Sequence, residues 1–490
     1  MTSITITKGA VDTQLYLKML NRHGLIAGAT GTGKTVTLKV ITEKLSQQGI
    51  PVFLADIKGD LSGLAKAGQW TPKMEERYKL LGITDPFEPQ AFPVRLWDVF
   101  GQAGHPVRAT IEGMGSLLLA RLLDLNETQT GILAIVFKLA KEKNWPLIDL
   151  KDLQSLLKEV YDHASEYSAQ YGNISKQSVG AIQRSLLVLE QEGADQFFGE
   201  PALDLQDFMQ LDSSGRGYIN ILSATRLFNS PKLYSTFLIW MLSRLFETLP
   251  EVGDLEKPKF VFFFDEAHLL FNDASKLFLE KVEQVVRLIR SKGVGIYFIT
   301  QNPQDLPESV LAQLGNRVQH ALRAYTPKEM KAIKVAAQSF RPNPEFDTET
   351  VLTELGTGEA LVSFLNEKGQ PSVVERSYIL SPQSSFDLLN ESEQLALITS
   401  SPFHQKYAVR VDNESAYEKL TEKSAREEKE KEREEEDKAR VAEEKASQKR
   451  SPGRPRKSSL EKAKDSFISS LFRTIAREVA KLIMGSFKRK

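Results

Sequence analysis

The chain has 490 residues, 41% of them hydrophobic and 9% aromatic, so it can bury a sizeable core. Lys plus Arg and Asp plus Glu both total 64, which gives no overall electrostatic case for nucleic acid or an anionic membrane as a partner. The absence of cysteine excludes disulfides, cysteine-bound zinc and iron–sulfur clusters. Residues 1–10 lack the basic and apolar regions of a secretory signal, and no apolar run reaches the roughly 18 residues of a membrane-spanning helix. We therefore expect a cytoplasmic protein.

Six short apolar runs bounded by turn residues are typical of buried strands. They cover residues 24–27, 51–55, 217–222, 260–264, 294–300 and 317–322. Helical patterns lie between several of them, as at 35–47 and 231–249, and this alternation predicts a largely parallel sheet covered by helices. Residues 358–365 and 371–379 are expected to form a closing hairpin. The predicted fold class is α/β.

The chain is predicted to contain one large domain followed by a tail. Residues 1–380 form the α/β domain, and helical apolar spacing predicts a helical insertion at about 106–212. Residues 381–417 are expected to be a linker. Residues 418–450 are nearly all Glu, Lys, Arg, Asp or Ala, a composition that cannot bury a core. That segment is predicted to be a solvated charged helix or a disordered segment.

Two further segments end the chain. The basic segment at residues 451–459 overlaps KRSPGRPRK, residues 449–457, which resembles an AT-hook, an extended Gly-Arg-Pro core that enters the narrow minor groove of A·T-rich DNA. A basic linker is the alternative, so DNA is a candidate partner. Residues 460–490 carry an apolar stripe at helical spacing, which predicts an amphipathic helix. Such a helix docks on protein or, as the alternative, lies on a membrane surface.

The segment GATGTGKT matches the phosphate-binding pattern G-x-x-x-x-G-K-[ST] and lies between a predicted strand and a predicted helix, as that motif requires. Its residues are Gly28, Ala29, Thr30, Gly31, Thr32, Gly33, Lys34 and Thr35. The glycines let N–H groups face phosphates, and the helix N-terminus adds partial positive charge. Lys34 is expected to reach the β and γ phosphates and Thr35 to bind Mg²⁺. The alternative is a chance glycine-rich turn, which the strand-loop-helix setting disfavours.

A second motif, FVFFFDEAH, places two acids at the end of a predicted strand. Asp265 is expected to hold Mg²⁺, and Glu266 to polarise the attacking water. The alternative is that both acids only open a helix, where negative charge is favoured. His268 is either a packed helix residue or a coupling residue.

The strand predicted at 294–300 is followed by Gln301, a candidate sensor of the γ phosphate, since strand ends line the ligand crevice in sheets of this type. A residue that only caps the strand is the alternative. The guanine-selective pattern N-K-x-D has its nearest counterpart in Asn302 to Asp305, which reads NPQD. ATP is therefore expected rather than GTP.

Five segments together resemble the FtsK/HerA superfamily of ring-forming P-loop motor ATPases, and in particular the bacterial HerA-like NTPases, over residues 4–379. These segments are NRHGLIAGATGTGKT, DIKGDLSGLA, RLWDVFG, DEAH and TQNPQDLP. The resemblance implies a RecA-like sheet, a hexameric ring and an arginine supplied across the subunit boundary. Arg317 and Arg323, followed by Arg290, are the candidates for that arginine, with a surface ion pair as the alternative for each.

The first functional hypothesis is an ATPase motor of the HerA type that acts on DNA or, as a second choice, on a polypeptide. HerA-type pumps carry a β-barrel before the P-loop that docks a nuclease, whereas 27 residues precede Gly28 here, so we do not expect a nuclease partner. The alternative function is a nucleotide-controlled interaction protein that hydrolyses ATP slowly without translocating a polymer.

Overall fold

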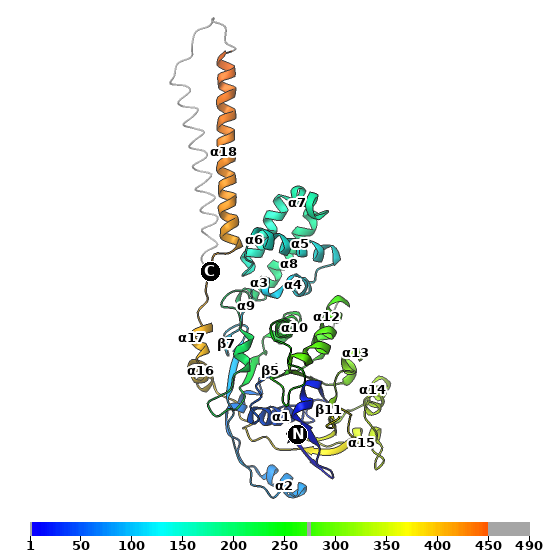
Figure 1. Cartoon of the computed structure of the whole chain (residues 1–490). Coiled ribbons are helices and arrows are strands. Elements are labelled where there is room, and N and C mark those ends of the chain that lie inside the picture. Colours follow the sequence, from blue (N-terminus) through cyan, green and yellow to red (C-terminus); the bar gives the residue numbers. More distant parts are fainter. Residues whose placement is uncertain (1, 272–275, 449–490) are drawn as a thin grey trace. The chain divides into compact units, whose positions relative to one another are not determined.

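A computed structural model describes residues 2–271 and 276–448 (Figure 1). The chain divides into a first unit, Met1–Thr421, and a second unit, Glu422–Lys490.

Within the described residues, the first unit is built on an 11-stranded sheet with the order β2-β13-β12-β11-β4-β10-β9-β5-β8-β6-β7. Neighbours from β11 to β7 in this order run parallel, whereas β12 pairs antiparallel with β11 and with β13, and β13 pairs antiparallel with β2. A separate small sheet pairs β1 with β3. The strands are β1 Ser3–Thr5, β2 Thr7–Gly9, β3 Gln14–Tyr16, β4 Gly24–Ala27, β5 Val52–Asp56, β6 Val94–Asp98, β7 His105–Pro106, β8 Ile219–Ser223, β9 Phe260–Phe264, β10 Val294–Thr300, β11 Asn316–Gln319, β12 Glu359–Ser363 and β13 Glu375–Ile379. The predicted α/β class with a large parallel sheet is confirmed.

The central strands are mostly apolar because helices cover both faces of the sheet. Successive side chains of a strand point to opposite faces, so Phe262 and Phe264 of β9 join one core while Val261 and Phe263 join the other. Helix α1, Lys34–Gln47, packs on the second of these faces. Helix α10, Pro231–Thr248, and helix α12, Lys276–Leu288, pack on the first.

The chain between β7 and β8 is helical, as the apolar spacing predicts. Its helices are α3 Ile111–Met114, α4 Ser116–Leu122, α5 Glu127–Lys143, α6 Leu150–Asp162, α7 Ala164–Tyr171, α8 Lys176–Gln191 and α9 Ala194–Phe197. They join the same core as α10. Other helices of the domain are α2 Pro72–Leu81, α11 His268–Phe271, α13 Glu308–Leu311, α14 Pro327–Gln338 and α15 Thr348–Glu354.

Residues 381–421, here called the strap, correct the expectation of a linker at 381–417. Glu43 of α1 is buried and accepts hydrogen bonds from Gln383 N (2.8 Å), Ser384 N (3.0 Å) and Ser384 Oγ (2.5 Å). Further along, helix α16, Glu391–Thr399, is followed by helix α17, Phe403–Tyr407, whose terminal aromatic residues are buried in the main core. The strap is therefore part of the folded domain.

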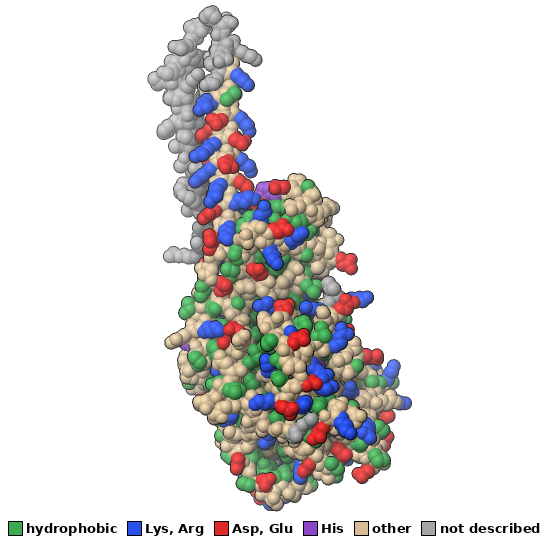
Figure 2. Space-filling view, viewed as in Figure 1, with side chains coloured by type: hydrophobic (Ala, Val, Ile, Leu, Met, Phe, Trp, Pro, Cys, Tyr) green, Lys and Arg blue, Asp and Glu red, His purple; other side chains and the backbone are tan. Residues whose placement is uncertain are grey.

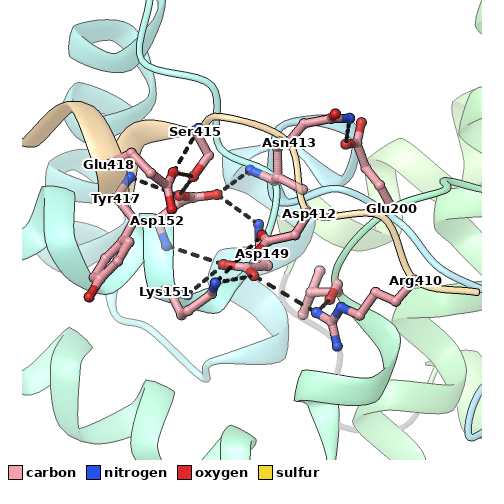
Figure 3. Close-up of polar contacts among 12 residues, drawn as sticks. Asp149, Lys151, Asp152, Glu200, Arg410, Asp412, Asn413, Ser415, Tyr417 and Glu418 are labelled. Atoms are coloured by element: carbon pink, nitrogen blue, oxygen red, sulfur yellow. Dashed lines mark hydrogen bonds and ion pairs between the residues drawn. The ribbon is translucent and has the colours of Figure 1, made fainter.

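The end of the strap is held by the helical insertion (Figure 3). The carboxylate of Asp152, in the first turn of α6, accepts hydrogen bonds from Ile148 N (2.7 Å) and Asp149 N (3.0 Å) on one oxygen. Its other oxygen accepts from Tyr417 N (2.9 Å) and the Ser415 hydroxyl. The same side chain thus caps a helix and anchors the strap.

Helix α18, Ala416–Gln448, begins at the end of the first unit and continues into the second. Lys, Arg, Asp and Glu dominate its exposed side chains (Figure 2). Lys438 and Glu434, four residues apart, form an ion pair. The sequence predicted either a charged helix or a disordered segment here, and the structure contains a helix. The AT-hook-like segment at 451–459 and the amphipathic helix at 460–490 lie outside the described residues. None of the described helices is both long enough and apolar enough to span a lipid bilayer.

Candidate nucleotide site

The strand order brings the two predicted nucleotide motifs to one edge of the sheet. The P-loop follows β4 and the acidic pair follows β9, and β10 lies between these two strands. Because all three strands are parallel, their carboxyl ends share one edge, where ligands bind in open α/β sheets. Ala267 N donates to Ile299 O at 2.9 Å and Gly28 N to Thr300 O at 3.3 Å, which ties both loops to β10.

The glycines of the P-loop are required by its backbone and its neighbours. Gly28 and Gly33 have φ of 153° and 123°, which L side chains rarely adopt. A Cβ at Gly28 would lie 2.5 Å from the Cβ of His320, a residue that sequence reasoning missed. The imidazole of His320 is buried, bonds to Thr37 Oγ1 (2.8 Å) and has its pKa lowered to about 4 by that burial. A neutral histidine therefore forms the floor beneath the loop.

Lys34 opens helix α1 and turns back over the loop. Its Nζ donates to Gly28 O at 2.6 Å and Ala29 O at 3.0 Å. Burial lowers the pKa of Lys34, as does nearby Lys58, whereas Glu266 and Asp265 raise it. The N-cap residue, Gly33, offers no side chain to the first turn of the helix. The first N–H groups of α1 therefore have no side-chain cap, and the charge of Lys34 lies beside them. Free N–H groups next to a positive charge are what an anion site requires.

Asp265 and Glu266 follow β9 directly. Asp265 is half-buried, and its burial raises the pKa of the carboxyl to about 6, while Lys58 lowers it. Glu266 is buried and has φ of 47°, a left-handed conformation that is strained for a residue with a side chain. Its Oε2 has no hydrogen-bond partner and lies 3.4 Å from Nδ1 of His268. A strained acid with an unbonded buried oxygen is typical of a functional position.

The turn after β5 brings Lys58 and Asp60 to the site. From the sequence, these two charged residues were used only as part of a segment that carries the family resemblance. Lys58 Nζ lies 3.4 Å from Glu266 Oε1, and the Thr35 hydroxyl donates to Asp60 Oδ2 at 3.3 Å. The signal that could have found them is the position of charged residues directly after a buried strand, which is also what identified Asp265 and Glu266.

Gln301 follows the last residue of β10 and is exposed. Thr300, the preceding residue, pairs in register with Ala27 at the start of the P-loop. This places Gln301 beside the loop, and its role as a sensor stays a prediction.

The three candidate arginines differ in their partners. Arg317 donates to three main-chain carbonyl oxygens of its own chain, those of Leu311, Leu314 and Ser339. Arg323 donates to Thr353 O (2.7 Å) and Leu355 O (3.2 Å) at the end of α15. Arg290 makes an ion pair with Asp254 Oδ1 (3.1 Å), a carboxylate that is 59% exposed. A role across a subunit boundary stays a prediction for all three.

The residues fit ATP and Mg²⁺. The outer side of the P-loop is open, because a Cβ at Gly31 would meet no atom within 4 Å. Thr35, Asp60 and Asp265 carry hard oxygen atoms of the kind that Mg²⁺ prefers. No group of three or more His, Asp or Glu residues forms a metal cage in the part of the chain that the structure describes. Mg²⁺ in nucleotide sites usually needs only one or two carboxylates besides substrate phosphates.

Comparison with known proteins identifies relatives. The profile of the family described as "Helicase HerA-like C-terminal" matches residues 3–490. The DNA double-strand break repair helicase HerA of Saccharolobus solfataricus is 23% identical over 364 residues, which cover 72% of this chain and 63% of that protein. The helicase of the same name from Sulfolobus acidocaldarius is 25% identical over 369 residues, covering 72% and 64%. This chain thus spans less than two thirds of the length of these relatives.

Solved structures share the fold. The plasmid coupling protein TrwB in complex with ADP and Mg²⁺ matches with a TM-score of 0.51 at 14% identity, over 80% of this chain and 92% of that chain. A trigonal form of the bacterial conjugative coupling protein TrwB with sulphate matches with a TM-score of 0.50 at 14% identity, over 80% and 96%. The resemblance indicated by the motifs is confirmed, and the chain belongs to the HerA-like C-terminal helicase family of P-loop ATPases.

Proposed function

We propose that this ATPase binds ATP with Mg²⁺, hydrolyses it at the carboxyl edge of the sheet and uses the energy to move DNA as an oligomeric ring. The observation that carries the proposal is the approach of Lys34 and Glu266 from two loops that a single strand, β10, separates. The pKa of Lys34 is lowered by burial and by Lys58 and raised by Glu266 and Asp265, so the charged groups of these loops influence one another. Such mutual perturbation in an open loop cluster is typical of a reaction site.

Each residue has one task in this proposal. Lys34 exchanges the carbonyl oxygens of its own loop for the β and γ phosphates, because a phosphate is the stronger acceptor. Thr35 and Asp265 hold Mg²⁺, which when bound neutralises phosphate charge that develops during transfer. Glu266 orients the attacking water through its unbonded oxygen and accepts its proton. Gln301 contacts the γ phosphate from the end of β10.

The ring proposal needs an arginine that reaches the nucleotide of a neighbouring subunit. Arg290 precedes β10, at the end of the strand opposite to the P-loop, so it is remote from its own site. Its ion pair with an exposed carboxylate is weak enough to exchange for a phosphate. Arg317 and Arg323 donate to main-chain carbonyls of their own chain, so Arg290 is the first candidate.

DNA as the polymer is supported by the names of the two helicase relatives and by the basic segment at 451–459. A motor that consumes ATP needs the cytoplasmic nucleotide pool, so we propose a cytoplasmic location.

The test is the steady-state rate of ATP hydrolysis without DNA, with single-stranded DNA and with double-stranded DNA. A motor on DNA should be stimulated several-fold by at least one of the two, and Lys34→Ala measured in parallel reports contaminating ATPases. An active protein whose rate is the same in all three conditions would instead be the nucleotide-controlled interaction protein.

A further inference from the structure

The turn at residues 57–61, which follows β5, is built around one buried carboxylate. Asp56 Oδ1 accepts from Gly59 N (2.7 Å) and Asp60 N (3.1 Å), and Asp56 Oδ2 accepts from Leu61 N (3.0 Å). Gly59 has φ of 74°, a conformation that glycine adopts at no steric cost. Three bonds to one carboxylate fix the path of the turn and hence the direction of its side chains.

This turn lies beside the acidic motif because β5 pairs in parallel with β9. The register joins Val52 with Val261 and Leu54 with Phe263, so both strands end at the same edge. On the other side the turn is tied to helix α1, since Asp60 accepts a hydrogen bond from the Thr35 hydroxyl at 3.3 Å. The turn is therefore held between the P-loop helix and the acidic pair.

Lys58 reaches from this turn to Glu266. Its Nζ lies 3.4 Å from Glu266 Oε1, and the side chain of Lys58 is 42% exposed whereas that of Glu266 is 8% exposed. The nearly buried carboxylate of Glu266 is thus covered by the Lys58 ammonium, which comes from the turn after the neighbouring strand β5. Burial lowers the pKa of Lys58, but Asp265 and Glu266 raise it by more, so the lysine stays charged.

The pair leaves the second oxygen of Glu266 without a hydrogen bond. Lys58 Nζ draws Oε1 to one side, which restricts the orientations open to the carboxylate, while Oε2 lies 3.4 Å from His268 Nδ1 without a hydrogen bond. A carboxylate that orients water needs this arrangement, because a misplacement of about 1 Å costs on the order of 10²-fold in rate.

We propose that Lys58 is a positioning residue that holds Glu266 ready to orient the attacking water. The inference rests on the proposed function, because it assigns a role toward the same reaction. Lys58 acts through Glu266 and not on the phosphates, so its loss lowers turnover and leaves nucleotide affinity unchanged.

The experiment combines two substitutions in the full-length protein. Lys58→Met keeps the length of the side chain and removes its charge, and we expect turnover to fall by roughly 10-fold to 10²-fold. Lys58→Arg, which keeps the charge, should retain most of the turnover of the unmutated protein. On a Glu266→Gln background, Lys58→Met should lower turnover by less than about 2-fold further, because two residues that act as a unit are not additive. Lys18→Met is the matched control. Lys18 lies in the segment before β4, at the end of the strand opposite to the P-loop, and makes an ion pair with Glu256 at 2.9 Å.

Affinity for a non-hydrolysable ATP analogue is the second readout. It should change by less than about 3-fold in Lys58→Met, since no phosphate contact is lost. Weakening by more than about 10-fold, or losses that multiply in the double variant, would mean that Lys58 contacts the nucleotide and would overturn the inference. Unchanged turnover in Lys58→Met, with reduced turnover in Glu266→Gln, would overturn the inference alone. Unchanged turnover in Glu266→Gln would overturn the proposed function as well.

Discussion

Two clusters of charged residues in this protein are built in opposite ways. At the nucleotide edge, Glu266 is strained and leaves one buried oxygen unbonded, and Lys34 is turned back onto carbonyls of its own loop. At the junction of the strap with the insertion, both oxygens of Asp152 accept two hydrogen bonds each. A fully bonded carboxylate stabilises a fold, whereas an incompletely bonded one is available to a ligand.

This comparison predicts that substitutions at the nucleotide edge change function with little change in stability. Lys34→Ala should have the largest effect, because it removes the charge that faces two phosphates. We expect ATP affinity to weaken by roughly 10²-fold or more and turnover to fall to background. Isothermal titration with ATP and a coupled hydrolysis assay measure both. Normal affinity in Lys34→Ala would show that this loop does not bind the phosphates.

The arginine candidates extend the comparison to a third type of site, the proposed boundary between subunits. Arg290→Ala should lower turnover by up to roughly 10³-fold with ATP affinity nearly unchanged, and mixing it with Lys34→Ala should restore some activity at hybrid interfaces. Arg317→Ala loses three hydrogen bonds within its own chain and should be destabilised by about 3 kcal/mol or more. Arg323→Ala, which loses two bonds at the end of α15, should be less destabilised. Absence of rescue in rings that exchange subunits would place the arginine within its own chain.

At the strap junction the expected effect is on stability alone. Asp152→Ala removes a helix cap and leaves main-chain donors unbonded, so we expect a loss of about 2 to 3 kcal/mol and faster proteolysis of the strap. Asp412→Ala is the matched control, because Asp412 is 81% exposed and makes a long ion pair with Lys151 at 3.7 Å. Turnover per folded molecule should be unchanged in both. A large loss of turnover in folded Asp152→Ala would mean that the strap also serves the reaction.

The smallest effect is expected from deleting residues 449–490. This segment carries no phosphate-binding motif, so basal hydrolysis should be unchanged. Binding to A·T-rich duplex should weaken more than binding to G·C-rich duplex if the segment is an AT-hook. Loss of nucleotide binding in the truncated protein would contradict the domain boundary.

Sequence reasoning succeeded where one segment carries its own signal. The bounds of β4, β9 and β10 match the prediction because each is an apolar run closed by turn or charged residues. Strands β6 and β7 were not predicted as strands, since Arg95 and Asp98 interrupt the first and the second has two residues. The strap was expected to be a linker because the sequence changes character after about residue 381, yet its aromatic residues Phe403 and Tyr407 are buried. Lys58 and Asp60 gain their meaning only from the pairing of β5 with β9, which lies over two hundred residues away.

The central claim is that Glu266 serves the chemistry and not the binding of ATP. Glu266→Gln keeps the size of the side chain but is a poor proton acceptor, so the measurement is bound nucleotide and product formation in one sample of this variant. The account predicts that ATP is bound with the affinity of the unmutated protein while turnover falls by roughly 10²-fold or more. Hydrolysis at the unmutated rate would contradict it and would make Glu266 only the acid that precedes helix α11.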